Sequence, residues 1–504
     1  MSASKPLLVL LALTGLAAPA RAQGAVEVYP GDDLQALVDA HLPGTRFLVR
    51  EGVHRNQQVW PKDGDVFSGE PGAVLSGAWI LTGWSYEAPY WTLGGQTAQG
   101  QVHGKCAEGY EGCRYPEDLF LDDRPLRHET SLEQLDSPGE WYFDYEMDKI
   151  YLLEDPGGAR VELGSTPHAF TGTARNVTIE NLTVEKYASP AQKGAIHGRD
   201  GSGWIVRDSD VRLNHGMGIR TGEGMQVIRN RIERNGQLGV GGFGDGVRIE
   251  ENWIRENNYA GFNWMWEAGG AKIVLADGVT FRMNRVESNV GPGLWTDIDT
   301  INVLYESNVV QGNAYSGIMH EISHDATIRG NWLAENGVAF DSWLWGAQIL
   351  VSTSRNTEVY DNSVIVAAQG GHGIGLVQQE CGAGIRGPRR TENNWVHDNT
   401  IIYLGDRGYT GGDADYDLEG MFAAGNRFES NSYRGTNLSE QKRWLWGGTW
   451  RNWREWQAGG QDLDGSIPVG RRRCGLLGIE PLVLPLLAWR ARRRRRAHPA
   501  SSHA

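Results

Sequence analysis

A short pattern of polar and apolar positions returns along the middle of the chain, from Gly203 to about Asn336. Each copy has the form Asn-x-apolar-x-x-Asn, which places two asparagines five residues apart. The copies are Asn230/Asn235, Asn252/Asn257, Asn284/Asn289, Asn308/Asn313 and Asn331/Asn336, with Ser209/Asn214 as a weaker first copy. Their spacings of 22, 32, 24 and 23 residues suit short strands joined by turns and are too irregular for leucine-rich repeats or propeller blades. Such a unit cannot bury its apolar side alone, whereas stacked units can.

A glycine and an apolar residue follow four residues after the second asparagine of a copy. This register holds in Gly218-Ile219, Gly239-Val240, Gly261-Phe262, Gly293-Leu294 and Gly317-Ile318. Because successive residues of a strand face opposite sides, an inward apolar residue predicts an outward residue at the next position and again two positions later. The predicted outward residues are Arg220, Asn263, Trp295 and Met319, then Met265, Asp297 and Glu321.

The repeated asparagines resemble those of right-handed parallel β-helix proteins of the carbohydrate-active type, in which each coil lies on the coil before. Asparagine tolerates left-handed turn geometry, and stacked amides hydrogen-bond along the pile. The resemblance implies an all-β fold: a right-handed parallel β-helix (solenoid) with an inserted small antiparallel β domain and an N-terminal capping helix. The helix is predicted at residues 34–42, where it covers the open edge of the first coil.

Changes of pattern divide the chain into six predicted segments. They are a signal peptide (1–22), the N-terminal cap and first coils (23–78), the inserted domain (79–164), the parallel β-helix (165–435), an aromatic closing segment (436–470) and a sorting signal (471–504). The inserted domain resembles that of some β-helix glycoside hydrolases, where it flanks the substrate groove. Long loops at residues 340–347, 369–392 and 405–419 are expected to form walls around one face. The tryptophans of the closing segment are expected to pack in the core or cap.

Both ends of the chain have the composition of targeting signals. Lys5, an apolar run at residues 7–13 and a small-x-small site at residues 20–22 are typical of a secretory signal peptide; a signal anchor is the alternative. The C-terminal end, with Cys474, an apolar run and an arginine cluster at residues 490–496, resembles a myxobacterial-type sorting signal. Two prolines interrupt that run, which leaves a loose basic tail as the alternative. We therefore expect a secreted protein of the cell envelope or cell surface, with envelope sorting machinery as a partner.

Charge and cysteine content narrow the set of partners. The chain has a formal charge of −14 although residues 471–504 contain nine arginines and one glutamate, so the rest of the chain is more acidic still. Such a surface disfavours nucleic acid and anionic membrane, and it favours a neutral glycan over a polyanionic one unless Ca²⁺ bridges the two. Four cysteines do not make a disulfide scaffold here. Cys106 and Cys113 are predicted to form a local disulfide, Cys381 is predicted to be unpaired, and the protein is expected to be a monomer.

Two of the predicted outward residues are carboxylates at the same offset in neighbouring coils. Asp297 and Glu321 are 24 residues apart, and their strands should lie ~4.8 Å apart. Adjacent carboxylates repel each other, which raises the pKa of one, and one protonated and one ionised acid is the equipment of a glycosidase. We predict these two as the catalytic pair, with Asp299 as the third catalytic candidate. A Ca²⁺ ion held between the coils and solvated turn positions are the alternatives, and no other metal or cofactor is expected.

Aromatic and hydrogen-bonding side chains around this pair suit a sugar ring. The predicted substrate-binding residues are Trp295, Arg220, Asn263, His324, Trp343 and Trp345. Trp264 and His320 are predicted to be core residues.

The function favoured by the sequence is glycoside hydrolysis of a polysaccharide by paired carboxylates. The first alternative is a polysaccharide lyase or epimerase, which needs a base such as Lys, Arg or His beside a metal-neutralised carboxylate. Lysine is scarce in the coils, where Lys186, Lys193 and Lys272 are the only ones between residues 177 and 431, and Arg220 and His324 remain as possible bases. The second alternative is a non-catalytic glycan-binding or adhesive surface module. An enzyme requires the carboxylates in a groove below loops, whereas a binding module is served by a flat face.

Overall fold

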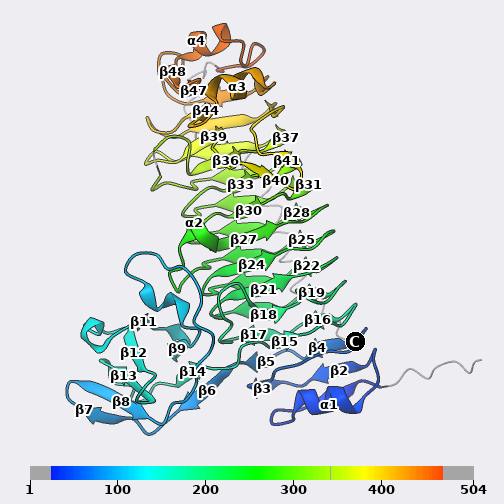
Figure 1. Ribbon diagram of the computed structural model, residues 1–504, viewed down its shortest axis with the longest axis vertical. Helices are drawn as coiled ribbons and strands as arrows, with labels where there is room; N and C mark the ends of the chain where they lie inside the picture. Colours follow the sequence, from blue (N-terminus) through cyan, green and yellow to red (C-terminus); the bar gives the residue numbers. More distant parts are fainter. Residues whose placement is uncertain (1–23, 341, 469–504) are drawn as a thin grey trace, which may run out of the picture.

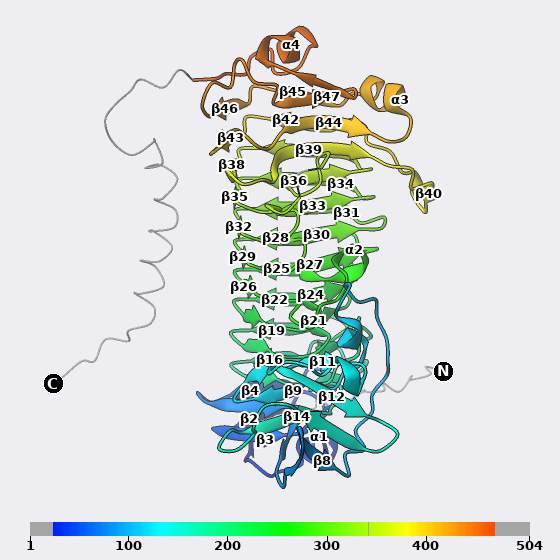
Figure 2. The same cartoon turned by 90° about the vertical axis from the view of Figure 1, so that its left-hand side faces the viewer.

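The computed structural model describes residues 24–340 and 342–468, which form a right-handed parallel β-helix as predicted (Figures 1 and 2). The signal peptide predicted at residues 1–22 and the sorting signal predicted at residues 471–504 lie outside the described residues. Among the helices of the described ranges, none is long and apolar enough to cross a membrane.

Three long sheets run the length of the stack, and a typical coil contributes one strand to each. The first sheet runs from β1 (Val26–Val28) to β45 (Arg427–Glu429), and the second runs from β3 (Gly52–Arg55) to β46 (Ser432–Arg434). The third sheet, seen in the centre of Figure 1, consists of β15 (Phe170–Thr171), β18 (Gly194–His197), β21 (Met217–Thr221), β24 (Leu238–Gly242), β27 (Gly269–Val274), β30 (Leu294–Asp297), β33 (Ile318–Glu321), β36 (Ala347–Ser352), β39 (His372–Gln378), β44 (Thr410–Ala414), β47 (Trp444–Trp446) and β48 (Thr449–Arg451).

The core is a set of aliphatic columns in which one side chain from each coil lies on the next. In the third sheet the strand register stacks Ile219, Val240, Ala271, Leu294 and Ile318, all at most 1% exposed. Each such burial of a Val, Leu or Ile side chain contributes about 1.5–3 kcal/mol. The stacking is therefore the main source of stability for units that have no core of their own.

The asparagines form two continuous hydrogen-bonded ladders, as predicted. In one, Asn252 Oδ1 accepts from the backbone N–H of Asn230 at 2.9 Å and from its Nδ2 at 3.1 Å, while Asn252 Nδ2 donates to Val227 O at 2.8 Å. The same contacts recur up to Asn431, and the second ladder runs from Asn214 to Asn336. The left-handed residue of each turn is not the asparagine but the residue before it, such as Arg229 or Met283. The asparagine amide instead satisfies the backbone groups that this turn exposes.

One copy of the pattern departs from the predicted register. The glycine and apolar residue of that coil are Gly270 and Ala271, which lead the core strand β27, not Gly261 and Phe262. The residues between them include the short helix α2 (Trp264–Glu267), which accounts for the spacing of 32 residues. The prediction that Asn263 and Met265 face outward from a strand is therefore wrong.

The inserted domain leaves the β-helix at β6 (Ala78–Leu81) and returns at β14 (Val161–Gly164), which pair antiparallel. It has a hydrophobic cluster of its own around Trp141 and Phe143, and it lies beside the lower coils in Figure 1. A loop of this domain reaches α2, where the backbone of Cys106 pairs with that of Phe262. Cys106 and Cys113 form the predicted disulfide in this loop, and Cys381 has no disulfide partner among the described residues, in line with the prediction.

Both ends of the described stack are covered. Helix α1 (Leu34–Ala40), predicted two residues longer, buries Leu34 and Val38 over the first coil, and Asp33 caps it by accepting from Ala36 N. At the other end the closing segment buries Trp444, Trp446 and Trp456 in the core, as predicted.

Candidate active site

The predicted catalytic pair lies on neighbouring strands of the third sheet. β30 and β33 pair in parallel with Thr296 opposite His320, so the next position brings Asp297 beside Glu321. Thr296 and His320 face the core, where Oγ1 and Nδ1 lie 2.8 Å apart, and burial lowers the pKa of His320 to about 3. His320 is thus a core residue, as predicted, and the two carboxylates face the opposite side of the sheet.

Asp297 is the negative partner of a buried ion pair. Lys272 Nζ on β27 lies 2.9 Å from Asp297 Oδ2, and both side chains are less than a tenth exposed. The same ammonium group lies 3.4 Å from the centroid of the Trp295 ring, a cation–π contact. Asp297 Oδ1 accepts from the backbone N–H of Ile298 at 2.8 Å. These contacts fix the orientation of the Asp297 carboxylate.

Glu321 has the electrostatics expected of the protonated member of the pair. Burial and, second, the charge of Asp297 raise the pKa of Glu321 from 4.5 to about 8, while the charge of Lys272 acts in the opposite direction. At neutral pH the site therefore holds a protonated Glu321 next to a charged Asp297.

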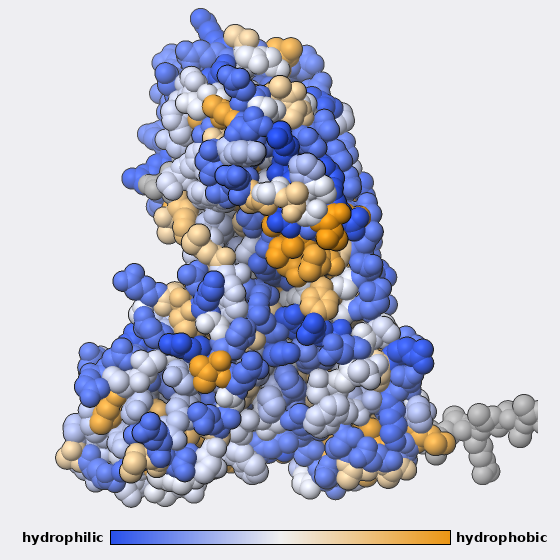
Figure 3. Space-filling model, in the orientation of Figure 1, coloured by the Kyte–Doolittle hydropathy of each residue, from blue (hydrophilic) through white to orange (hydrophobic). Residues whose placement is uncertain are grey.

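The Glu321 side chain lies in an aromatic pocket of about 330 Å³. Trp264 of α2 stacks on Tyr315 with ring centroids 3.8 Å apart, and Phe340 meets both rings edge-on. The pocket is lined by Trp264, Met265, Trp295, Tyr315, Met319, Glu321, Phe340, Ser342, Trp345 and Gln379. In Figure 3, which looks onto the third sheet, the surface is hollowed beside α2 and above the inserted domain. Flat apolar rings around one carboxyl group suit a single sugar residue.

Two of the segments predicted as loops supply walls of this pocket, although the second of them also contains the buried strand β39. Phe340, Ser342 and Trp345 belong to the loop predicted at 340–347, and Gln379 belongs to the segment predicted at 369–392. The third segment, predicted as a loop at 405–419, instead contains the strand β44, and its Asp413 supports the wall by accepting a hydrogen bond from Trp343 Nε1 at 2.5 Å.

Helix α2 forms the opposite wall, and the inserted domain holds it in place. Asn263 caps the helix by accepting from Met265 N at 2.9 Å, and Asn263 N donates to Lys105 O in the loop of the inserted domain at 2.9 Å. The capping residue positions the wall but does not line it. Trp264, predicted to be core, is instead half-buried and lines the pocket, because the insertion of α2 moves it off the strand.

Asp299 does not belong to the pocket. The backbone turns away after Asp297, with positive φ at Ile298 (47°) and Asp299 (55°). Asp299 Oδ2 lies 3.0 Å from Arg389 Nη2, next to the hairpin of β40 (Ala383–Gly384) and β41 (Gly387–Pro388). The Asp299 carboxylate is therefore engaged in an ion pair with Arg389, and the Asp299 side chain is only 3% exposed.

The predicted substrate-binding residues fall into two groups. Trp295 and Trp345 line the pocket, with Trp343 behind the wall. Arg220 is on β21, three strands away from β30, and His324 is 1% exposed at the start of β34 (His324–Arg329) in the first sheet. Neither Arg220 nor His324 contacts the pocket.

Sequence reasoning missed several residues of the site, foremost Lys272 and Tyr315. Lys272 lies opposite Trp295 in the register, 23 residues earlier, and counting one coil back from Trp295 would have found it. Tyr315 and Phe340 lie in turns and loops, where no periodicity marks a side chain that faces the pocket.

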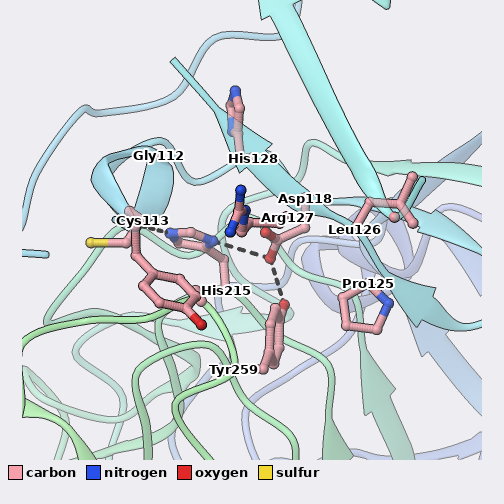
Figure 4. Close-up of a pocket in the computed structure, with 12 residues that line it drawn as sticks. Gly112, Cys113, Asp118, Pro125, Leu126, Arg127, His128, His215 and Tyr259 are labelled. Carbon is pink, nitrogen blue, oxygen red and sulfur yellow. Dashed lines mark hydrogen bonds and ion pairs between the residues drawn. The ribbon is translucent and has the colours of Figure 1, made fainter. Parts of the chain in front are cut away.

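A second pocket, of about 290 Å³, lies where the inserted domain meets the coils (Figure 4). His215 Nδ1 lies 3.1 Å from Asp118 Oδ2, His215 Nε2 donates to Cys113 O at 2.8 Å, and Tyr259 donates to Asp118 Oδ2 at 2.5 Å. Burial lowers the pKa of His215, but the Asp118 carboxylate outweighs it and the pKa is raised. Because these groups satisfy one another, we interpret this network as a joint between the two domains.

A Ca²⁺ ion between the coils was the predicted alternative to a catalytic pair. In residues 24–340 and 342–468 no group of three or more His, Cys, Asp or Glu side chains is arranged to hold a metal ion. The positive charge next to Asp297 comes from Lys272.

Comparisons with known proteins agree with this fold. The family model for the right-handed β-helix region matches residues 168–268 and 194–364. The structure of XylC with xylose is similar at 16% identity and a TM-score of 0.64, covering 82% of each chain. The A-module of the mannuronan C-5 epimerase AlgE6 of Azotobacter vinelandii matches at 14% identity and a TM-score of 0.46, covering 80% of this chain and 89% of that one. No curated protein sequence matches this chain.

Proposed function

We propose that this protein hydrolyses a glycosidic bond of a polysaccharide, with Glu321 as the general acid and Asp297 as its ionised partner. The observation that carries the proposal is a protonated carboxyl group in an aromatic pocket, beside a carboxylate held by Lys272. Glu321 donates its proton to the leaving oxygen, while Asp297 stabilises or attacks the anomeric carbon on the other side of the bond.

The spacing of the two strands favours retention of configuration. Neighbouring strands lie ~4.8 Å apart, near the carboxyl separation of about 5–5.5 Å typical of retaining glycosidases. Asp297 then acts as the nucleophile, and Glu321 afterwards activates the water. The longer, inverting arrangement with Asp299 is disfavoured because Arg389 engages that carboxylate.

Two observations weigh against the alternatives. A lyase or epimerase needs a free base, and the cation nearest the pair, Lys272, is held by Asp297 and the Trp295 ring. A non-catalytic binding module is served by a flat face, whereas the carboxyl group of Glu321 lies in a pocket with walls from three segments.

The experiment is an assay of neutral and acidic polysaccharides for two products, new reducing ends and an unsaturated sugar that absorbs in the ultraviolet. We expect reducing ends alone, and their loss in Asp297→Asn. An ultraviolet-absorbing product would move the protein to the lyase class, and no product with any substrate would favour the binding module.

We also propose that the protein is exported and sorted to the cell envelope or cell surface by the signals at its two ends. A chain cut after Gly470 should still be folded and exported but lose its retention at the surface. Full-length protein found only in the cytoplasm would contradict export.

A further inference from the structure

A group of basic side chains lies on the third sheet, below the catalytic pair. Arg220 is on β21, Arg199 follows β18 and Lys193 precedes it. The guanidinium groups of Arg199 and Arg220 lie over one ring, that of Phe243, with Cζ 4.9 and 5.2 Å from its centroid. Two guanidinium groups over one aromatic ring, with the charge of Lys193 acting on both, stand out in a chain with a net charge of −14.

The positive charge of this group is only partly compensated. Within the described residues neither Lys193 nor Arg220 forms an ion pair, and Arg220 Nε is a buried donor without a hydrogen-bond partner. The carboxylates whose charges act on Arg220 are Glu267, which already accepts from Gln192, and Asp200, which lies 3.8 Å from Arg199 Nε.

The charges of these cations oppose one another's protonated forms. Burial lowers the pKa of Lys193, and the charges of Arg199 and Arg220 lower it further. Burial is also the largest cause that lowers the pKa of Arg220, and Arg199 adds to it. Like charges brought together in a partly desolvated place oppose folding unless a ligand of the opposite sign compensates them.

The basic group is aligned with the catalytic centre. The strand register stacks Arg220, Gly241, Lys272 and Trp295 in one outward column, so that Arg220 is about 14 Å from the pocket, three strand spacings of ~4.8 Å. The position between Arg220 and Lys272 is Gly241, where the buried side chains of Met217 and Leu238 fill the space that a side chain would take. A glycan that reaches both places lies over these buried side chains, outside the column itself, and spans the distance with a few sugar residues.

We propose that Lys193, Arg199 and Arg220 form a subsite for an anionic group of the glycan, a carboxylate, sulfate or phosphate, a few sugar residues from the cleaved bond. The inference rests on the proposed function in one respect, that the ligand is a glycan lying along the third sheet. This subsite refines the prediction of a neutral glycan that was made from the net charge of the protein. The sugar residue in the pocket is neutral, and the negative charge belongs to a sugar residue further along the glycan.

The test is calorimetric binding of oligosaccharides of equal length, which requires no catalysis. The probes are oligogalacturonates, sulfated oligosaccharides and neutral xylo-oligosaccharides, each titrated into the full chain at low and high salt. We expect anionic probes to bind about tenfold tighter than neutral ones at low salt, with most of this difference lost at high salt. Inorganic sulfate should compete with the sulfated probes.

The variants are Arg220→Gln, Lys193→Gln and Arg199→Gln. Arg199 is the most exposed of the three, so Arg199→Gln tests the anionic subsite even if a substitution at a more buried position impairs folding. Each should weaken binding of anionic probes by about threefold to tenfold and leave neutral probes unchanged. The matched control is Arg229→Gln, at an arginine paired with Asp208 at a turn away from this sheet. Equal affinity for anionic and neutral probes, or an equal effect of the control, would overturn the subsite. Anion binding without any hydrolysis would refute the proposed function and leave the subsite standing.

Discussion

Replacing Glu321 by glutamine should make the protein more stable than the wild type at alkaline pH. The pKa of Glu321 is raised from 4.5 to about 8, so the folded state binds this proton more tightly than the unfolded chain. A raised pKa gives stability that is complete below the unfolded value and is lost as pH rises through the folded value. The wild type should therefore lose stability between about pH 4.5 and pH 8, and Glu321→Gln should not.

The size of this effect follows from the same two values. The interval from 4.5 to about 8 corresponds to a ceiling of about 5 kcal/mol, at about 1.4 kcal/mol per pKa unit. Solvent at the mouth of the pocket screens the charges and reduces this to about 2–3 kcal/mol. At pH 5 both proteins bear an uncharged group at position 321 and should differ by less than about 1 kcal/mol.

Urea denaturation of the wild type and Glu321→Gln at pH 5 and pH 8.5 measures this difference. Glu335→Gln, at an exposed glutamate elsewhere on the stack, is the control and should follow the wild type. A stability difference between wild type and Glu321→Gln that is the same at both pH values would refute the idea that Glu321 is protonated at neutral pH.

Three further predictions concern contacts of the fold and the site. Asn308→Ala should lower the free energy of unfolding by about 1–3 kcal/mol, because it leaves ladder groups unpaired, and a loss below about 0.5 kcal/mol in urea denaturation would argue against a buried ladder. Lys272→Met should cost about 3–5 kcal/mol because it leaves Asp297 charged and unpaired, and adding Asp297→Asn should restore most of the loss; additive losses in the double-mutant cycle would exclude the coupling. His215→Gln should destabilise more at pH 5.5 than at pH 9, because the raised pKa of His215 stabilises the fold below about pH 6.5 and this contribution disappears as pH rises through the folded value. Thermal unfolding at the two pH values tests this, and an equal loss at both would mean that His215 is neutral.

The sequence was sufficient to predict the β-helix and the partnership of Asp297 and Glu321. Both depend on period: the asparagine spacing defines the coil, and alternation along a strand defines which side chains face outward. The prediction of outward residues failed in the coil that contains the extra helix α2, because it was counted from Gly261, whereas the matching glycine in the core strand β27 is Gly270. Asn263 became a helix cap and Trp264 a pocket wall because α2 is inserted before β27.

Features that depend on long-range placement could not be derived from period. The ion pair of Asp299 with Arg389 joins residues 90 apart through a hairpin that no repeat predicts. Tyr315 and Phe340 reach the pocket from turns, where backbone direction, not alternation, decides which way a side chain points. The charge state of Glu321 likewise follows from the depth of the pocket as much as from its neighbour Asp297.

The most direct test of the account compares two kinds of glycoside in Glu321→Gln and Asp297→Asn. A dinitrophenyl glycoside has a leaving group that needs no proton, whereas an oligosaccharide needs a general acid. Glu321→Gln should lower kcat/KM by about 10²–10⁴-fold on the oligosaccharide and far less on the dinitrophenyl glycoside, because general acid catalysis contributes about that much. Asp297→Asn should lower kcat/KM on both substrates. Equal losses on the two substrates in Glu321→Gln, or unchanged rates in both variants, would contradict the assignment of Glu321 as the acid and Asp297 as its ionised partner.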